Sequence, residues 1–138
     1  MSAEIIRKKR PKYLNVFILG AQLPFPGLVS IFHRVTGAGL FVLFWLVIWL
    51  FDKSLASPED YAEVVSWLHH PIVLIIGLAL LWAFIFHFYA GIRYLLLDCN
   101  IGYHLKAARF SSFMVAIACW GTFIVVAAFI IWEMWPLW

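Results

Sequence analysis

Four residues near position 30 bring a hydroxyl, an imidazole and a guanidinium to one helical face. Ser30, His33, Arg34 and Gly37 stand at relative positions 0, 3, 4 and 7, which an α-helix places on the same side. A flat ligand could approach over the glycine while the polar side chains converge on it. This arrangement suits a quinone carbonyl or a haem propionate. An arginine that reaches the lipid headgroups is the ordinary alternative for Arg34 taken alone.

A second candidate is His87, which lies alone inside an apolar stretch. A neutral imidazole there could simply hydrogen-bond a backbone carbonyl, but the cost of a polar group in apolar surroundings favours a ligand role. Gly91 is one helical turn away and would let a macrocycle pack against the backbone.

The other histidines and both cysteines are too dispersed for a zinc or soft-metal site, so we assign no site to His69, His70, His104, Cys99 and Cys119.

The elements that carry these residues follow from composition. Of 138 residues, 65% are hydrophobic and 12% are charged, and the mean hydropathy is +0.95. Such values indicate an integral membrane protein. Three stretches, 35–51, 71–92 and 110–132, lack Asp, Glu, Lys and Arg, and a spanning helix needs roughly 20 residues. None alternates apolar with polar residues as a barrel strand does. We therefore predict an all-α protein with three transmembrane helices.

Prolines and caps predict where these helices begin. The prolines at 24 and 26 set the first helix to start near Gly27 or Leu28. The run Ser57-Pro58-Glu59-Asp60 has the pattern of an N-cap, a first-turn proline and an acidic first turn. We predict a single membrane-anchor domain, 1–138, with an inner N-terminal segment 1–27, spans at about 28–52, 71–98 and 109–134, and a short outer surface helix at about 58–68.

Basic residues predict the orientation. They gather before the first span and around the connection between the second and third, at Arg7, Lys8, Lys9, Arg10, Lys12, Arg93, Lys106 and Arg109. The connection 52–70 contains Lys53 as its only Lys or Arg, and the C-terminal tail contains neither. Because cytoplasmic loops carry the excess of Lys and Arg, we predict an N-in/C-out topology. The net charge of +3 then reflects orientation, and the composition indicates lipid and no nucleic acid as the partner.

Several motifs together resemble the cytochrome b large membrane-anchor subunit of succinate dehydrogenase, respiratory complex II. They are Arg10-Pro11, then Ser30-Ile31-Phe32-His33-Arg34-Val35-Thr36-Gly37, then Ser57-Pro58-Glu59, then His87-Phe88-Tyr89-Ala90-Gly91-Ile92-Arg93 with Asp98. The resemblance spans nearly the whole chain in the right order. One departure is Tyr94, where the family often has histidine, which leaves open any polar role at that position.

This resemblance implies a subunit of a hetero-oligomeric helix bundle. In the family a flavoprotein subunit oxidises succinate, an iron-sulfur subunit carries the electrons, and two small anchor subunits bind ubiquinone and a shared haem b. By position, His87 matches the axial ligand of the haem iron, and Gly91 matches the haem-packing position. Ser30 and Arg34 match quinone-binding residues. His33 and Arg34 match residues near the haem propionates. The bacterial cytoplasmic membrane or the mitochondrial inner membrane would hold it, and the complex could form a trimer of heterotetramers.

The implied mechanism assigns no succinate chemistry to this chain. Arg34 would polarise a quinone carbonyl and, with Ser30 as a donor, stabilise the negative charge that arriving electrons build up. The second axial histidine of the haem would come from the other anchor subunit. The chain has no flavin fingerprint and no cysteine cluster for iron-sulfur, so it cannot oxidise succinate alone.

Three alternatives remain open at this point. A quinol:fumarate reductase anchor would use the same scaffold in the opposite direction, and turnover of succinate and fumarate separates the two. A small transporter subunit would need polar residues in several helices, yet the third stretch offers only Ser112, Cys119 and Thr122. A purely structural membrane subunit would lack the absorption spectrum of a cytochrome.

Overall fold

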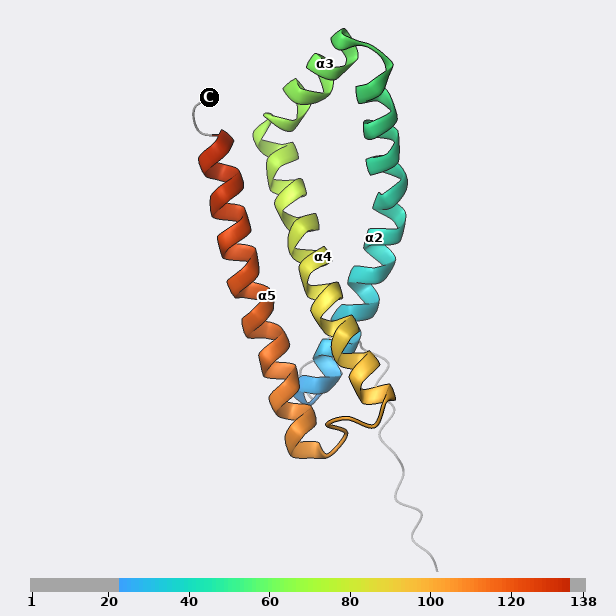
Figure 1. Ribbon diagram of the computed structural model, residues 1–138, viewed down its shortest axis with the longest axis vertical. Helices are drawn as coiled ribbons and strands as arrows, with labels where there is room; N and C mark the ends of the chain where they lie inside the picture. The colour runs from blue at the N-terminus through green and yellow to red at the C-terminus, as the bar shows by residue number, and fades with distance from the viewer. Residues whose placement is uncertain (1–22, 135–138) are drawn as a thin grey trace, which may run out of the picture.

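The computed structural model describes residues 23–134, which form four helices (Figure 1). They are α2 (Phe25–Ala56), α3 (Pro58–Leu68), α4 (Pro71–Asp98) and α5 (Leu105–Met134). The described residues contain no strand, and α2, α4 and α5 are long and apolar enough to cross a membrane. The all-α prediction with three spans is therefore confirmed. Most of the inner segment 1–27 lies outside the described residues, and the N-in/C-out topology stays a prediction.

Helix α2 begins at Phe25, earlier than the prolines were expected to allow. Pro24 is its N-cap, with extended backbone at φ −62° and ψ 152°, and Pro26 lies in the first turn. A first-turn proline loses no intrahelical hydrogen bond, because its missing N–H would have had no partner there. The expected start near Gly27 or Leu28 was therefore wrong. The helix also continues to Ala56, past the predicted end near residue 52.

A polar corner joins α2 to α3. The Ser57 hydroxyl accepts a hydrogen bond from the Asp60 N–H (3.0 Å) and donates one to Asp60 Oδ2 (2.9 Å), as the predicted N-cap requires. Lys53 Nζ, in the last turn of α2, forms ion pairs with Asp60 (3.1 Å) and Glu63 (2.9 Å). The Ser57 hydroxyl and the Lys53 ammonium hold the pKa of the Asp60 carboxyl below its usual range.

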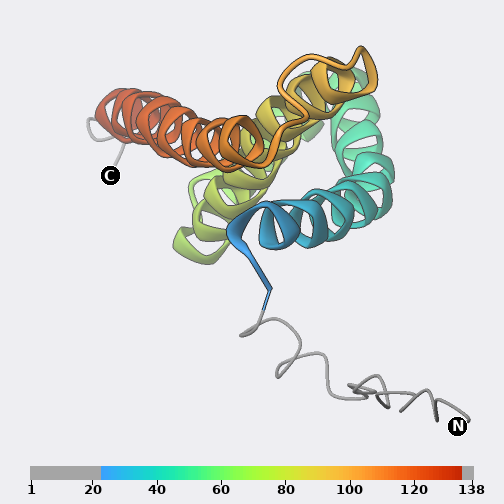
Figure 2. The same cartoon turned by 90° about the horizontal axis from the view of Figure 1, so that it is seen from below.

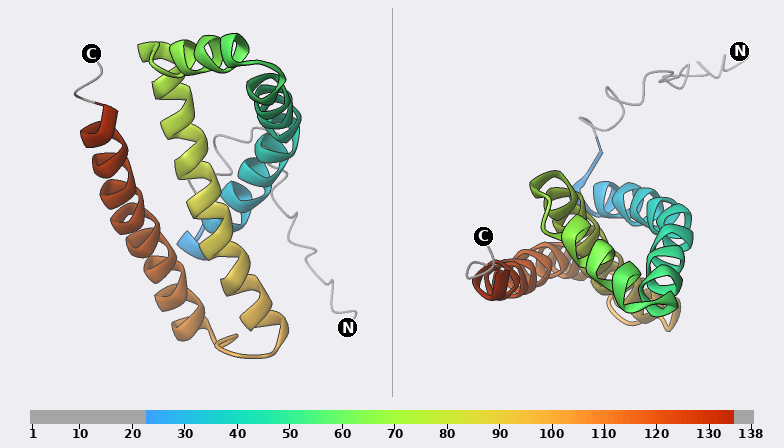
Figure 3. Two further views of the ribbon diagram at one scale, coloured as in Figure 1. Left: turned by 45° about the horizontal axis from the view of Figure 1, so that its top comes forward. Right: turned by 90° about the horizontal axis from the view of Figure 1, so that it is seen from above.

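Helix α4 is the central long helix of the bundle. Figures 2 and 3 place it between α5 and most of α2, and Figures 1 and 3 show α3 crossing the top from α2 to α4. The aromatic contacts between α2 and α4 join Phe32 and His33 to residues between Trp82 and Tyr94 of α4. The buried core lies where the three long helices meet and consists of Val29, Ile85, Phe86, Ala90, Val115 and Cys119.

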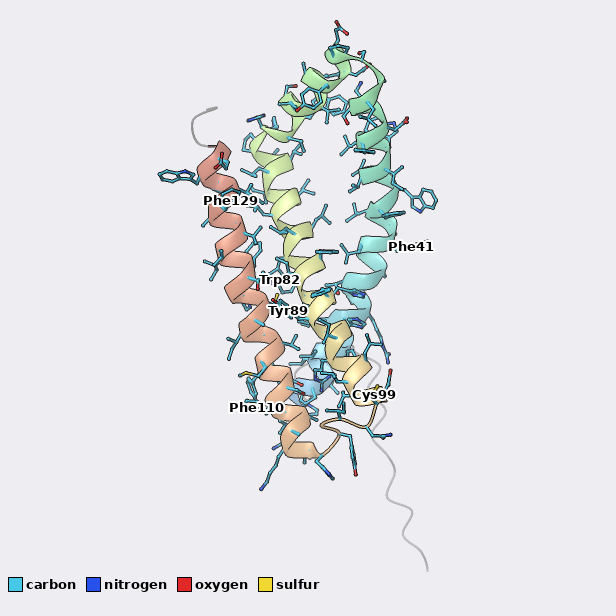
Figure 4. All side chains as sticks on the ribbon, in the orientation of Figure 1. Phe41, Trp82, Tyr89, Cys99, Phe110 and Phe129 are labelled. Carbon is cyan, nitrogen blue, oxygen red and sulfur yellow. The ribbon has the colours of Figure 1, made fainter. Side chains whose placement is uncertain are left out.

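Outside this core the long helices expose large apolar side chains. Phe41 on α2 is 68% exposed and Phe129 on α5 is 64% exposed (Figure 4). A water-soluble domain rarely shows continuous apolar faces of this kind, whereas lipid tails or neighbouring membrane helices suit them.

The connection from α4 to α5 begins with a Schellman motif. Asn100 N–H donates to Leu97 O and Ile101 N–H donates to Leu96 O, each at 2.9 Å. Asn100 has φ +60°, in the left-handed region that asparagine tolerates better than most residues, and Gly102 follows with φ +75°. These bonds fix how the chain leaves α4.

Candidate functional site

The structure brings together two histidines that are 54 residues apart in sequence. The rings of His33 on α2 and His87 on α4 are stacked, with centroids 4.1 Å apart and an interplanar angle of 9°. Tyr94, two turns after His87 on α4, lies against His33, with ring centroids 5.1 Å apart. One histidine of each predicted motif and the adjacent Tyr94 thus form one partly buried cluster.

A hydrogen bond to the backbone of α2 orients the His87 ring. Its Nδ1 lies 3.1 Å from the carbonyl oxygen of His33. Because a carbonyl oxygen only accepts, this bond requires the proton on Nδ1 and leaves the lone pair on Nε2. The buried Thr36 lies beside this bond: its hydroxyl donates to Phe32 O (2.7 Å), and its oxygen is 3.1 Å from His33 O and 3.4 Å from His87 Nδ1. The free acceptor of His87 is therefore Nε2.

Gly37 lets His87 approach α2 this closely. A Cβ atom at position 37 would lie 2.8 Å from His87 Cε1 and 3.3 Å from its Nδ1. We had expected the space beside this glycine to admit a ligand, but the His87 ring fills it. At Gly91 a Cβ would lie 3.7 Å from His33 Nε2, an ordinary contact distance. The glycine that the cluster needs for packing is therefore Gly37.

Two polar atoms of the cluster are buried without a hydrogen-bond partner among residues 23–134. They are His33 Nε2 and the Tyr94 hydroxyl. Leaving such an atom unpaired costs about 1–3 kcal/mol, and buried polar groups in native proteins are nearly always paired. The two atoms therefore mark a position where a polar group of a ligand or a neighbouring chain can be received.

Ser30 and Arg34 lie on α2 beside the cluster but are not joined to it by a hydrogen bond. Ser30 is half-buried and Arg34 is exposed, and neither side chain bonds to another described residue. An exposed guanidinium with all its donors available can bind an acceptor that approaches from outside this chain.

Sequence reasoning missed parts of this site for identifiable reasons. Thr36 lies inside the quoted motif but has no charge or unusual placement to attract attention. Tyr94 follows His87 by seven residues, a spacing that places both on one face, but it departs from the family pattern and received no role. Arg93 was quoted in the second motif and used as a topological marker but received no role, and its hydrogen-bond partner Ser111 was absent from the polar residues that we counted on the third span.

Comparison with known proteins decides the family. Residues 6–129 match the family described as Succinate dehydrogenase/Fumarate reductase transmembrane subunit. The chain belongs to this family. The match covers both motifs and all three long helices except the end of α5, so the resemblance inferred from the motifs is confirmed. Together with the three apolar helices, it makes this family member a multi-pass membrane protein.

Individual members of the family give the same result. A protein of Paracoccus denitrificans is 32% identical over 116 residues, covering 80% of this chain and 83% of its own. A protein of Coxiella burnetii is 30% identical over 125 residues, covering 90% of this chain and 98% of its own. Both are named succinate dehydrogenase cytochrome b556 subunit. This family member is therefore similar over most of its length to anchor subunits of an oxidoreductase complex, which leaves the transporter and structural alternatives without support.

Proposed function

We propose that this chain is the cytochrome b anchor of a succinate:quinone oxidoreductase in a bacterial cytoplasmic membrane. It binds haem b through His87 and helps to form the site where ubiquinone is reduced. Its partners are the flavoprotein subunit, the iron-sulfur subunit and a second small membrane anchor. Family membership and the names of the bacterial relatives support this assignment.

The observation that carries the haem proposal is the hydrogen bond from His87 Nδ1 to the carbonyl of His33. Histidines that bind a metal almost always donate their other ring N–H to a carbonyl, carboxylate or water, which fixes the tautomer and the ring orientation. His87 has this arrangement, and its Nε2 is the atom that can bind iron. When bound, haem supplies one-electron redox chemistry near the quinone.

His33 and Tyr94 fit the propionate side of the cofactor. A carboxylate accepts hydrogen bonds from several donors, and the two buried unpaired atoms, His33 Nε2 and the Tyr94 hydroxyl, can both donate. This role requires the His33 proton to sit on Nε2. Gly91, one turn from His87, lies beside His33, and its haem-packing role stays part of the proposal.

We infer that the second axial ligand comes from another chain, because the stacking of His33 on His87 argues against His33 in that role. The two rings are stacked face to face with centroids 4.1 Å apart, which leaves no room between them for a macrocycle, so they cannot bind one iron from its opposite faces. A bis-histidine haem needs ligands on both faces. We therefore assign the opposite face to a histidine of the second anchor subunit. Assembly into a trimer of heterotetramers stays a prediction.

Ser30 and Arg34 are assigned to the quinone. Arg34 is exposed and has no ion-pair partner among the described residues, so its guanidinium can donate to a quinone carbonyl. Ser30 stands one turn earlier on the same helix and can add a hydroxyl donor. As electrons arrive, these donors stabilise the negative charge that develops on the quinone oxygen.

A quinol:fumarate reductase anchor is the second candidate, because the family description covers both complexes. The relatives named above favour succinate oxidation. Measuring succinate oxidation and fumarate reduction by the purified complex decides between the two directions.

The decisive test of the haem role is an absorption spectrum of the complete purified complex carrying His87→Ala. We expect the bis-histidine haem spectrum to be lost or altered, because the axial nitrogen is removed. His104→Ala is the matched control, since His104 is exposed at the start of α5 and should leave the spectrum unchanged. An unaltered bis-histidine spectrum in the His87 variant would refute the proposal.

A further inference from the structure

A groove between α4 and α5 lies apart from the histidine cluster. It has a volume of about 400 Å³, within the range of about 300–1,000 Å³ typical of ligand sites. Its walls are almost entirely apolar and include Leu96 on α4, Phe110 and Met114 on α5, and Ile101 on the connection. Figure 4 shows this region between the labelled residues Tyr89 and Phe110. The Schellman hydrogen bond from Ile101 N–H to Leu96 O fixes the loop side of the groove.

One charged side chain lines this groove. Arg93 is only 6% exposed. Its Nε donates to Ser111 Oγ (3.0 Å) and its Nη2 donates to Ala108 O (3.3 Å), while its Cζ lies 5.1 Å from the centroid of the Tyr94 ring. Nη1 makes no hydrogen bond to any residue of the described part of the chain.

The charge of Arg93 is not neutralised by these contacts. A hydroxyl and a carbonyl accept hydrogen bonds but carry no negative charge. Both ion pairs found within residues 23–134 belong to Lys53, at the far end of the bundle. A buried guanidinium in apolar surroundings is costly unless an anion accompanies it. The groove therefore combines an apolar wall with a buried cation that has no anionic partner among residues 23–134.

We propose that this groove binds an anionic phospholipid. The lipid phosphate pairs with the Arg93 guanidinium, whose Nη1 is available, and an acyl chain lies along the wall formed by Phe110 and Met114. A guanidinium matches the geometry of phosphate oxygens, and basic pockets between transmembrane helices on the cytoplasmic side bind anionic headgroups. The apolar walls favour a lipid over a free phosphate ion. The proposal does not depend on the haem or quinone roles.

The test uses the complete complex, freed of lipid and then incubated with phosphatidylglycerol or phosphatidylethanolamine of identical acyl chains. Native mass spectrometry counts the lipids that remain bound. We expect the wild-type complex to retain phosphatidylglycerol about tenfold better, because both lipids carry a phosphate but the ammonium group of phosphatidylethanolamine cancels its net charge and repels the guanidinium. Arg93→Gln should remove this preference. Arg109→Gln is the matched control, because Arg109 is an exposed cation near the same end of α5 that does not line the groove.

A second variant keeps the test decisive if Arg93→Gln prevents assembly. Ala118→Phe fills the groove from α5 while leaving the hydrogen bonds of Arg93 untouched, and it should reduce retention of phosphatidylglycerol to the level of phosphatidylethanolamine. Equal retention of the two lipids by the wild type would overturn the proposal, as would unchanged retention in Ala118→Phe. Displacement of the lipid by an equal concentration of glycerol phosphate would show that the groove binds free phosphate groups, and it would refute the proposal of a lipid site.

Discussion

Replacing Gly37 by alanine tests whether the close approach of His87 to α2 is required. The added Cβ would lie 2.8 Å from His87 Cε1, whereas carbon atoms in favourable contact are about 3.5–4.0 Å apart. The imidazole must therefore move away by roughly 0.7 Å or more. A shift of that size takes the bond from Nδ1 to His33 O from 3.1 Å to well beyond the usual hydrogen-bond range of about 2.7–3.2 Å.

The expected loss follows from two effects. Overpacking a contact of this kind typically costs about 1–3 kcal/mol of stability. Losing the hydrogen bond that orients a metal-binding histidine typically costs about 10–100-fold in affinity. Gly37→Ala should therefore lower the affinity of the assembled complex for haem by about 10–100-fold and lower its thermal unfolding midpoint. Haem titration followed by absorbance, together with far-ultraviolet circular dichroism, measures both.

Gly39→Ala is the matched control on the same helix. A Cβ at position 39 would meet no atom within 4 Å, and alanine favours a helix over glycine by about 1 kcal/mol. This variant should keep full haem affinity and unfold at the same or a higher temperature. Equal haem affinity in the two variants would refute the reasoning, because the same methyl group would then be tolerated against His87.

The remaining predictions address the quinone, Tyr94, the α2–α3 corner and the orientation. Arg34→Ala should impair quinone reduction far more than succinate oxidation by an artificial dye that accepts electrons upstream; equal losses would indicate a role in assembly. Tyr94→Phe should keep the haem spectrum but lower the haem midpoint potential by up to roughly 40 mV, the one-electron equivalent of a hydrogen bond worth about 1 kcal/mol. An unchanged potential would mean that Tyr94 does not bond to a propionate. Because the pKa of Asp60 is held below its usual value, the corner should be fully stabilised above the unfolded value of about 3.9 and weaken as pH falls through the lower folded pKa. Amide hydrogen exchange in α3 should show this dependence, and Asp60→Asn should abolish it. Reporter fusions should place the α4–α5 connection near Lys106 inside and helix α3 at Glu59 outside.

The sequence predicted the helices well because charge is excluded from lipid. Charge-free stretches and the Ser57 cap located the elements, since both signals are local along the chain. The error at Phe25 arose because proline was treated as a barrier at a position where the first turn accepts it.

The pairing between helices could not be predicted in the same way. These helices are apolar on all sides, so their sequences do not mark which face meets a neighbour. The stacking of His33 on His87 and the contact of Arg93 with Ser111 depend on how the helices cross. The role of Gly37 has the same origin, because it becomes visible only when the opposite ring is in position.

The acceptor that orients His87 belongs to the backbone of residue 33 and not to its side chain. Under the proposed role, residue 33 orients the iron-binding histidine through its backbone and contacts the propionates through its side chain. These two contributions can therefore be changed separately. A substitution that keeps the helix intact can change the side chain at 33, and with it the redox potential, while the His87 tautomer stays fixed. Evolution or design can thus adjust the electrochemistry of the haem without rebuilding its attachment to the protein.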